Sequence, residues 1–300
     1  MNASAVALQV LVLFLVMMVG WVSKKCKIVQ DAGESSISGL VMNITLPCLA
    51  VTSFQREYDA STLKDVGLVV LVGIMIYIAS FFLGMLVSKP LPKERRKVFW
   101  MAVLLSNSGY MGIPVVQAAM GESGLVHAVS HQIAFYVIVW TLGVMIFQGV
   151  QGISVKQILT KPGLIGLVVG LGFFIGGVRL PKVLFDAMDM IANMTTPLSM
   201  LLVGMQLSRA KWSDFNDKSV YALAAIRLAL IPLATLAVMK LTGFSGPAAN
   251  VELLIAGMPV AAILSVFAAN FHSDEAYASQ LIFITTTFSV ITVPLLVMLM

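Results

Sequence analysis

Apolar residues occur in long runs along the chain, and short polar stretches with most of the charged residues separate them. An apolar run of about 20 residues can cross the hydrocarbon of a bilayer as an α-helix. We therefore predict an all-α integral membrane protein with ten transmembrane helices joined by short connections. The predicted spans are 3–23, 36–55, 66–88, 98–120, 124–149, 162–180, 183–207, 219–241, 249–271 and 276–299.

The composition agrees with this interpretation. Apolar residues make up 59% of the chain and charged residues 11%, against roughly 45–50% and ~25% in ordinary soluble domains. So few charges cannot cover the surface of a soluble protein of 300 residues. A soluble enzyme, a nucleic-acid-binding protein and a secreted disulfide scaffold are excluded. Cys26 and Cys48 give no disulfide framework or thiolate metal site, and we expect no cofactor.

The basic residues predict the orientation in the membrane. One set of loops carries Lys24, Lys25, Lys27, Lys89, Lys93, Arg95, Arg96, Lys97, Lys156, Lys161, Arg209, Lys211 and Lys218. The opposite set carries Arg56, Lys64, Arg179, Lys182 and Lys240, which leaves Arg227 inside a span. The positive-inside rule places the first set in the cytoplasm. Both termini are then predicted on the extracytoplasmic side of the cell membrane, without a cleaved signal peptide.

Two short motifs occur once in each half of the chain. Asn43-Ile-Thr-Leu-Pro47 is repeated as Asn193-Met-Thr-Thr-Pro197, and the motif that begins at Gly112 (GIPV) is repeated at Gly257 (GMPV). The matching motifs lie 150 and 145 residues apart and in order. They indicate an internal duplication.

The duplication predicts the domain organisation. Residues 1–150 and 162–300 form two repeats of five helices, and 151–161 form a cytoplasmic linker. An odd number of spans per repeat places the two repeats in opposite orientations across the membrane. Inverted repeats of this kind are typical of secondary transporters.

The Gly-x-Pro motifs predict that helices four and nine are discontinuous and cross each other. Proline removes a backbone donor and glycine lowers the cost of leaving the helix, and Ser108 and Gly109 make the first break polar. Pro114 and Pro259 are expected in the first turn of a new half-helix. The two half-helix N-termini would then converge and suit an anion. An ordinary proline kink in each helix is the alternative.

Charged residues inside the spans are few. Asp189 and Glu252 lie within two turns of predicted span ends, so we expect no buried carboxylate at either break. This expectation argues against a sodium or proton antiporter. Arg227 lies deep in span eight. It either supplies a positive field for an anionic substrate or caps backbone carbonyls at the broken end of span nine.

Two histidines lie one turn apart, His127 and His131, and Gln132 follows the second. A metal site needs further ligands, and no carboxylate or cysteine is placed to supply them, so no metal is expected. A proton relay through His131 and simple hydrogen bonding between helices both remain open.

With these residues assembled, the chain resembles the auxin efflux carrier family along nearly its whole length. The resemblance rests on Val41–Leu49 (VMNITLPCL), Asn107–Gly121 (NSGYMGIPVVQAAMG), Arg227 and Leu253–Ala261 (LLIAGMPVA). It implies ten helices in two inverted repeats, with a scaffold of spans one, two, six and seven that also forms a dimer. It also implies that a carboxylate-bearing substrate binds beside the crossed helices.

The resemblance is closer to compact bacterial carriers than to plant carriers. The chain has only about a dozen residues between spans five and six, and Ser61 and Thr62 stand where plant members place an aspartate. Such carriers transport small carboxylates such as malonate or malate. The candidate binding residues are Asn107, Ser108, Gly109, Gly112, Pro114, Gly257, Pro259, Arg227, Asn43 and Asn193.

The sequence thus predicts a non-enzymatic secondary carrier for small organic anions, working by elevator-type alternating access in a bacterial plasma membrane. Asn107 would hold the carboxylate together with the backbone N–H groups of the breaks. Coupling to protons or to sodium is left open, as are the direction of flux and the carboxylate carried. A sodium-coupled carrier of the bile-acid type and a non-transporting sensor or assembly partner are the alternatives.

Overall fold

A computed structural model describes residues 3–208 and 217–300. Arg209 and Lys211, which the sequence analysis predicts on the cytoplasmic side, therefore lie outside the described part. The first half contains α1 (Ala3–Lys25), α2 (Asp31–Leu40), η1 (Val41–Thr45), α3 (Leu46–Ser53), α4 (Ala60–Val87), α5 (Lys93–Leu104), η2 (Ser108–Gly112), α6 (Ile113–Ile138), η3 (Val139–Gly143) and α7 (Val144–Gln148). The second half contains η4 (Val150–Gly152), α8 (Val155–Leu159), α9 (Pro162–Gly176), α10 (Lys182–Ala192), α11 (Thr195–Leu207), α12 (Lys218–Ala225), η6 (Ile226–Leu230), α13 (Ile231–Thr242), α14 (Pro247–Ala256), α15 (Ile263–Asn270) and α16 (Glu275–Val297).

Seven helical stretches of the described chain are long and apolar enough to cross a membrane. They are Leu8–Lys25, Asp31–Ser53, Ala60–Val87, Ser108–Gln148, Lys182–Leu207, Lys218–Thr242 and Glu275–Val297. Pro162–Gly176 and Pro247–Ala256 are apolar but shorter. The sequence prediction of an all-helical, multi-pass membrane protein is thus confirmed at this level.

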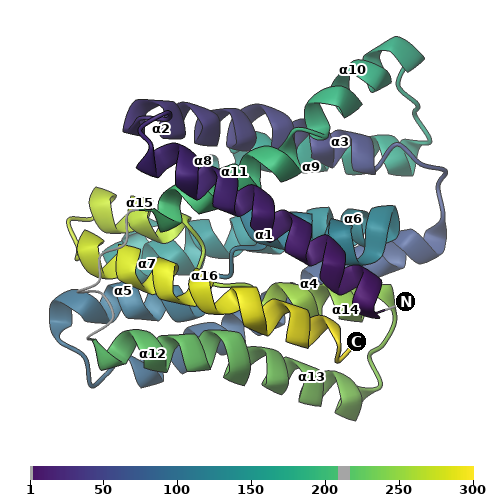
Figure 1. Cartoon of the computed structure of the whole chain (residues 1–300). Helices are drawn as coiled ribbons and strands as arrows, with labels where there is room; N and C mark the ends of the chain where they lie inside the picture. The colour runs from purple at the N-terminus through teal and green to yellow at the C-terminus, as the bar shows by residue number, and fades with distance from the viewer. Residues whose placement is uncertain (1–2, 209–216) are drawn as a thin grey trace.

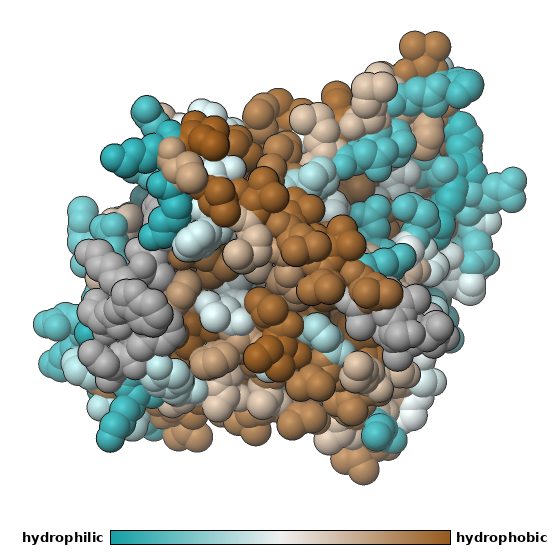
Figure 2. Space-filling view, viewed as in Figure 1, coloured by the Kyte–Doolittle hydropathy of each residue, from teal (hydrophilic) through white to brown (hydrophobic). Residues whose placement is uncertain are grey.

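Large apolar side chains cover much of the outside of the bundle. Leu8, Leu15, Leu71, Leu233 and Ile291 are each at least half exposed. Figure 2 shows hydrophobic residues across the middle of one face, with hydrophilic residues gathered at the left and upper right. A continuous apolar surface of this kind is costly in water and suits contact with lipid. Both chain ends lie at the same end of the molecule (Figure 1).

The long stretch Ser108–Gln148 contains two helical segments. Gly121 interrupts it with φ 65° and ψ −152°, a backbone conformation that glycine adopts without a Cβ clash. The predicted boundary between spans 98–120 and 124–149 falls at this residue. Several helices also begin earlier than predicted, for example α4 at Ala60, because Asp59 caps its N-terminus ahead of the apolar run.

Two pairs of helices pack closely through glycine. A Cβ on Gly20 of α1 would lie 2.1 Å from the carbonyl oxygen of Leu201 in α11, and one on Gly204 would lie 1.8 Å from that of Met17. A Cβ on Gly166 of α9 would likewise lie 2.7 Å from Pro47 Cα in α3. Only glycine permits these approaches, which are typical of membrane helices. The first long apolar helix of each half, α1 or α9, therefore packs against a proline-containing helix of the other half, α11 or α3.

Candidate functional site

The two predicted interruptions are present, and they pair with each other. The Asn107 N–H donates to the Pro259 carbonyl at 2.8 Å, and the Ala261 N–H donates to the Leu105 carbonyl at 3.1 Å. Between them, Ser106 and Val260 form an isolated antiparallel bridge. Unwinding frees backbone groups that must be satisfied inside a membrane protein, and this pairing satisfies several of them. We call the paired segments, residues 105–107 and 257–262, the crossing.

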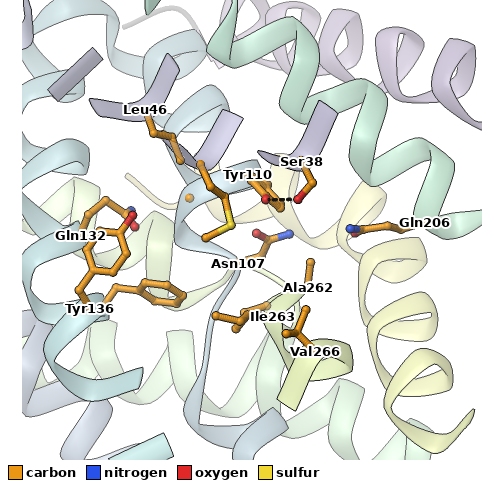
Figure 3. Close-up of a pocket in the computed structure, with 14 residues that line it drawn as sticks. Ser38, Leu46, Asn107, Tyr110, Gln132, Tyr136, Gln206, Ala262, Ile263 and Val266 are labelled. Carbon is orange, nitrogen blue, oxygen red and sulfur yellow. Dashed lines mark hydrogen bonds between the residues drawn. The ribbon is translucent and has the colours of Figure 1, made fainter. Parts of the chain in front are cut away.

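A cavity of about 100 Å³ lies against the crossing (Figure 3). Its walls come from the α2–α3 region, from η2 and α6, from α11 and from the start of α15. The lining residues are Ser38, Met42, Leu46, Asn107, Gly109, Tyr110, Gln132, Phe135, Tyr136, Gln206, Ala261, Ala262, Ile263 and Val266. None of these side chains carries a formal charge at neutral pH. We call this space the crossing cavity.

Two helix N-termini begin at the cavity wall. The second half of the first broken helix starts at Ser108 and continues through α6, and α15 starts at Ile263. The first N–H groups of a helix have no partner within the helix, and they carry partial positive charge. Gly109 and Tyr110 at one start and Ala262 and Ile263 at the other all line the cavity. The cavity therefore presents a positive field without a cationic side chain.

Polar side chains add hydrogen-bond donors. Asn107 is 5% exposed and lies at the centre of the cavity view (Figure 3). The Gln132 amide oxygen accepts from the Ser108 hydroxyl at 3.4 Å, while its buried Nε2 has no hydrogen-bond partner among the described residues. The Tyr110 and Ser38 hydroxyls lie 2.8 Å apart. A buried amide N–H without a partner is costly, and a ligand in the cavity would relieve that cost.

A second, polar hollow of about 330 Å³ adjoins the crossing cavity. It shares Ser38, Gln206, Ala262 and Val266 with the cavity, and it extends to Glu34 and Glu275. Glu34 forms an ion pair at 2.8 Å with Lys24, which is in the loop set predicted to be cytoplasmic. The hollow therefore extends from the cavity towards Glu34 and Glu275.

The structure brings some of the predicted site residues to the cavity. Asn107 and Gly109 line it, and Ser108 contacts Gln132 beside it. Pro259 contributes through its backbone carbonyl. Gly112 lies behind this wall, where an added Cβ would approach the Asn107 carbonyl to 3.4 Å.

Gly257 and Pro114 support the crossing without lining the cavity. A Cβ on Gly257 would lie 2.3 Å from Leu296 Cδ2 of α16, so glycine permits close packing at this point. Pro114 lies in the first turn of α6, but the π-helical turn η2 precedes it, so this half-helix begins at Ser108.

The expected position of Pro259 is wrong. It lies within the unwound segment, and α15 begins only at Ile263. The reason is the bridge between Ser106 and Val260, which holds the residue after Pro259 in an extended conformation. Pairing between the two breaks thus outweighs the preference of proline for a first helical turn.

Arg227 is fully buried, with 1% of its surface exposed, and it does not line the cavity. Its guanidinium donates to the carbonyls of Met258, Ala256 and Val103 at 3.1, 3.2 and 3.4 Å. These carbonyls belong to the broken end of α14 and to the last turn of α5. The placement matches the alternative in which Arg227 caps backbone carbonyls.

The two equivalent asparagines lie at the surface of their helices. Asn43 is exposed, donates to the Gly39 carbonyl at 2.9 Å and lines a neighbouring hollow rather than the crossing cavity. Asn193 is exposed and donates to Asp189 at 3.0 Å. The local breaks also differ, because the first is the π-helical turn η1 and the second a gap between α10 and α11.

The sequence interpretation overlooked four polar lining residues: Ser38, Tyr110, Gln132 and Gln206. Each is an uncharged polar side chain inside an apolar span, and this feature could have identified them as candidate site residues. The expectation of no buried carboxylate near the breaks is wrong. Glu252 is 0% exposed and lies one turn before the unwound segment, because α14 is only ten residues long.

The fold and the polar cavity at paired helix breaks define a class of protein, the membrane transporters. Residues 5–157 and 147–297 match the family described as "Membrane transport protein". The chain belongs to this family, the auxin efflux carrier family that its sequence motifs indicate.

Two archaeal relatives resemble the chain over nearly its whole length. An "uncharacterized transporter" of Methanothermobacter thermautotrophicus is 25% identical over 98% of this chain and 97% of its own. A second "uncharacterized transporter", from Methanocaldococcus jannaschii, is 24% identical over 95% of this chain and 96% of its own. Protein ECM3 of Saccharomyces cerevisiae is 25% identical over 44% of this chain and 23% of its own length.

Proposed function

We propose that the protein is a secondary carrier of small organic anions, namely mono- or dicarboxylates, across the plasma membrane. The observation that carries the proposal is the crossing cavity, where two helix N-termini and the donors of Asn107, Gln132 and Tyr110 meet. A carboxylate accepts several hydrogen bonds and is stabilised by the partial positive charge of helix N-termini. The cavity is also small, which favours small substrates.

The carrier consists of ten spans in two inverted repeats. The seven long stretches become ten spans when Ser108–Gln148 is divided at Gly121 and the shorter apolar helices are included. The reciprocal glycine contacts of α1 with α11 and of α9 with α3 support a twofold relation between the halves. These four helices and α10 would form the scaffold and the contact of a homodimer.

Loop contacts support the predicted orientation. Arg95 forms ion pairs with Asp217 and Asp274, so the segment with Asp274 lies on the same side as the segments with Arg95 and Lys218, which the positive-inside rule assigns to the cytoplasm. Both termini then face outward. Transport would occur by an elevator-type movement of the crossing against the scaffold, with the polar hollow as the inward path.

The first experiment is a thermal-shift screen of the purified protein with pyruvate, lactate, malonate and malate, each with and without sodium. A ligand at a hundred times its dissociation constant stabilises the folded state by about 2.7 kcal/mol. We expect at least one carboxylate to stabilise the protein without sodium. Stabilisation by sodium alone, with no response to any carboxylate, would contradict the proposal and favour a sodium-coupled carrier.

Asn107→Ala tests the site directly. Losing a hydrogen bond to a charged group costs about 1.5–3 kcal/mol, so the carboxylate affinity should fall roughly 10- to 150-fold while the protein still folds. The matched control is Asn270→Ala, at an exposed asparagine at the end of α15, which should bind as the wild type does. Unchanged affinity in Asn107→Ala would remove Asn107 from the site.

A further inference from the structure

A carboxylate and a histidine form a buried pair behind the crossing cavity. Glu252 of α14 and His131 of α6 are 0% and 2% exposed, and Glu252 Oε1 lies 2.7 Å from His131 Nδ1. Neither residue lines the cavity, yet each is close to it along the chain, since Gln132 follows His131 and α14 ends at the crossing. The other carboxylate oxygen, Glu252 Oε2, has no hydrogen-bond partner among the described residues.

Hydrogen bonds connect this pair to the crossing. His131 Nε2 lies 2.9 Å from the Tyr77 hydroxyl, and that hydroxyl lies 3.1 Å from the Ser106 hydroxyl. Ser106 is the residue that pairs with Val260 between the two broken helices. A continuous chain therefore runs from α14 through α6 and α4 to the crossing itself.

The protonation of His131 sets the direction of this chain. In neutral His131, the Nδ1–H group donates to Glu252. The unprotonated Nε2 then accepts from the Tyr77 hydroxyl, and Tyr77 in turn accepts from Ser106. When Nε2 takes up a proton from water, it donates to Tyr77, and Tyr77 then donates to Ser106. The Ser106 hydroxyl changes from donor to acceptor, and the change reverses when Nε2 returns the proton to water.

The charged groups around the pair are few. Glu252 faces His131 from α14 and Tyr77 faces it from α4, while Arg227 of η6 is buried at the crossing, where it donates to backbone carbonyls. With neutral His131, the pair carries the negative charge of Glu252. With protonated His131 the pair is neutral and no longer repels an anion in the cavity. Charge balance of this kind lowers the cost of moving buried groups within a membrane.

We propose that the His131–Glu252 pair is the proton-binding site of the carrier and that it couples anion transport to the symport of one proton. The inference rests on the proposed function, because it assigns the coupling ion of the same cavity. A buried carboxylate repels an anion unless the neighbouring imidazole is protonated. Anion binding and protonation of His131 therefore favour each other, and by linkage they do so equally.

Titration calorimetry with pyruvate tests the coupling. Pyruvate is used because its carboxyl group stays ionised between about pH 6 and about pH 11. The binding enthalpy in buffers with different ionisation enthalpies gives the number of protons taken up on binding. This number should approach one per pyruvate at pH values where His131 is deprotonated in the protein without ligand. In that range the dissociation constant of pyruvate should rise about tenfold per pH unit.

Two variants and one control identify the group that takes up the proton. His131→Gln should bind pyruvate with an affinity independent of pH and without proton uptake. If His131→Gln does not fold, Glu252→Gln is used instead, and it should change the pH dependence of pyruvate binding. The control is His127→Gln, one turn earlier on α6, where the histidine bonds to the Ser123 carbonyl and lies 3.6 Å from Asp65. The control should keep the proton uptake of the wild type.

The outcomes separate this inference from the proposed function. If pyruvate binds without proton uptake at every pH, or if His131→Gln keeps the uptake, the coupling site is wrong while the anion site stands. If no carboxylate binds, the proposed function fails. The proton site is then tested by nitrogen-15 NMR of the three histidines, with His131→Gln as the assignment. A His131 signal that keeps one protonation state from about pH 5 to about pH 11 would overturn the inference.

Discussion

The residues that line the cavity and the charged residues near it differ in their chemistry. The cavity side presents helix N-termini and neutral donors such as Asn107 and Gln132. Arg227, Glu252 and His131 do not line the cavity, and all are at most 2% exposed. An anion in the cavity would thus contact neutral donors. The charged side chains have other partners, since Arg227 binds backbone carbonyls and Glu252 pairs with His131. The difference separates ligand recognition from structural support and charge balance.

The largest effect is expected where a charged residue supports the backbone. Arg227→Leu leaves three buried carbonyls without their donor. The protein should lose about 3 kcal/mol or more of stability, measured by thermal unfolding in detergent. Arg227→Lys keeps the charge without the planar fork and should lose less. Normal stability with lost anion binding in Arg227→Leu would instead make Arg227 a ligand of the substrate.

The next effect concerns the neutrality of the cavity side. Gln132→Glu changes one amide into a carboxylate of nearly the same shape and places a negative charge in the cavity. Carboxylate binding at about pH 8 should weaken at least about 100-fold, because like charges close together in a poorly solvated site repel by several kcal/mol. Asn270→Asp adds the same charge at an exposed position and serves as the control. Equal affinity in Gln132→Glu and wild type would show that the anion binds elsewhere.

A smaller effect is expected from a single neutral donor. Tyr110→Phe removes the hydroxyl that pairs with Ser38 and keeps the ring. Because the Tyr110 hydroxyl already has Ser38 as a neutral partner, its loss should cost about 1 kcal/mol, less than the loss of Asn107, and the carboxylate dissociation constant should rise about fivefold. The comparison of Tyr110→Phe with Asn107→Ala in one titration series ranks the two donors. A larger loss in Tyr110→Phe would place the substrate nearer to α2 than to the crossing.

The smallest effect lies outside both sets of residues. Hydrogen bonds from the Ser61 hydroxyl and the Thr62 backbone lower the pKa of Asp59, the N-cap of α4, to about 2. Its contribution to stability is therefore present above the unfolded pKa near 3.9 and is lost as the pH falls towards 2. The stability difference between wild type and Asp59→Asn should shrink over that window in thermal-unfolding series. A difference that stays constant would contradict the capping role.

The sequence predicts the apolar helices well, because the length and composition of an apolar run are local properties. It also predicts that spans four and nine are interrupted, since glycine and proline act on their own backbone. It does not predict where the half-helices begin after the interruptions. Ser106 and Val260 pair across the molecule, and this contact between distant segments decides which residues are extended and where α15 begins.

The candidate site could be predicted only in part for the same reason. Asn107 and Gly109 belong to the broken segment and were identified from its motif, whereas Gln206 and Ser38 reach the cavity through tertiary packing. Glu252 was placed near a span end by counting residues. Its burial depends on α4 and α6, which cover the short helix α14 and supply His131 as its partner.

Counterflow in proteoliposomes tests the central claim most directly, because it requires both binding at the crossing cavity and alternating access. Vesicles that contain the purified protein and unlabelled malonate or pyruvate are diluted into a trace of the same labelled carboxylate. The account predicts transient accumulation of label in wild-type and Asn270→Ala vesicles and little accumulation with Asn107→Ala. Wild-type vesicles that accumulate no more label than protein-free vesicles, for both carboxylates, would contradict it.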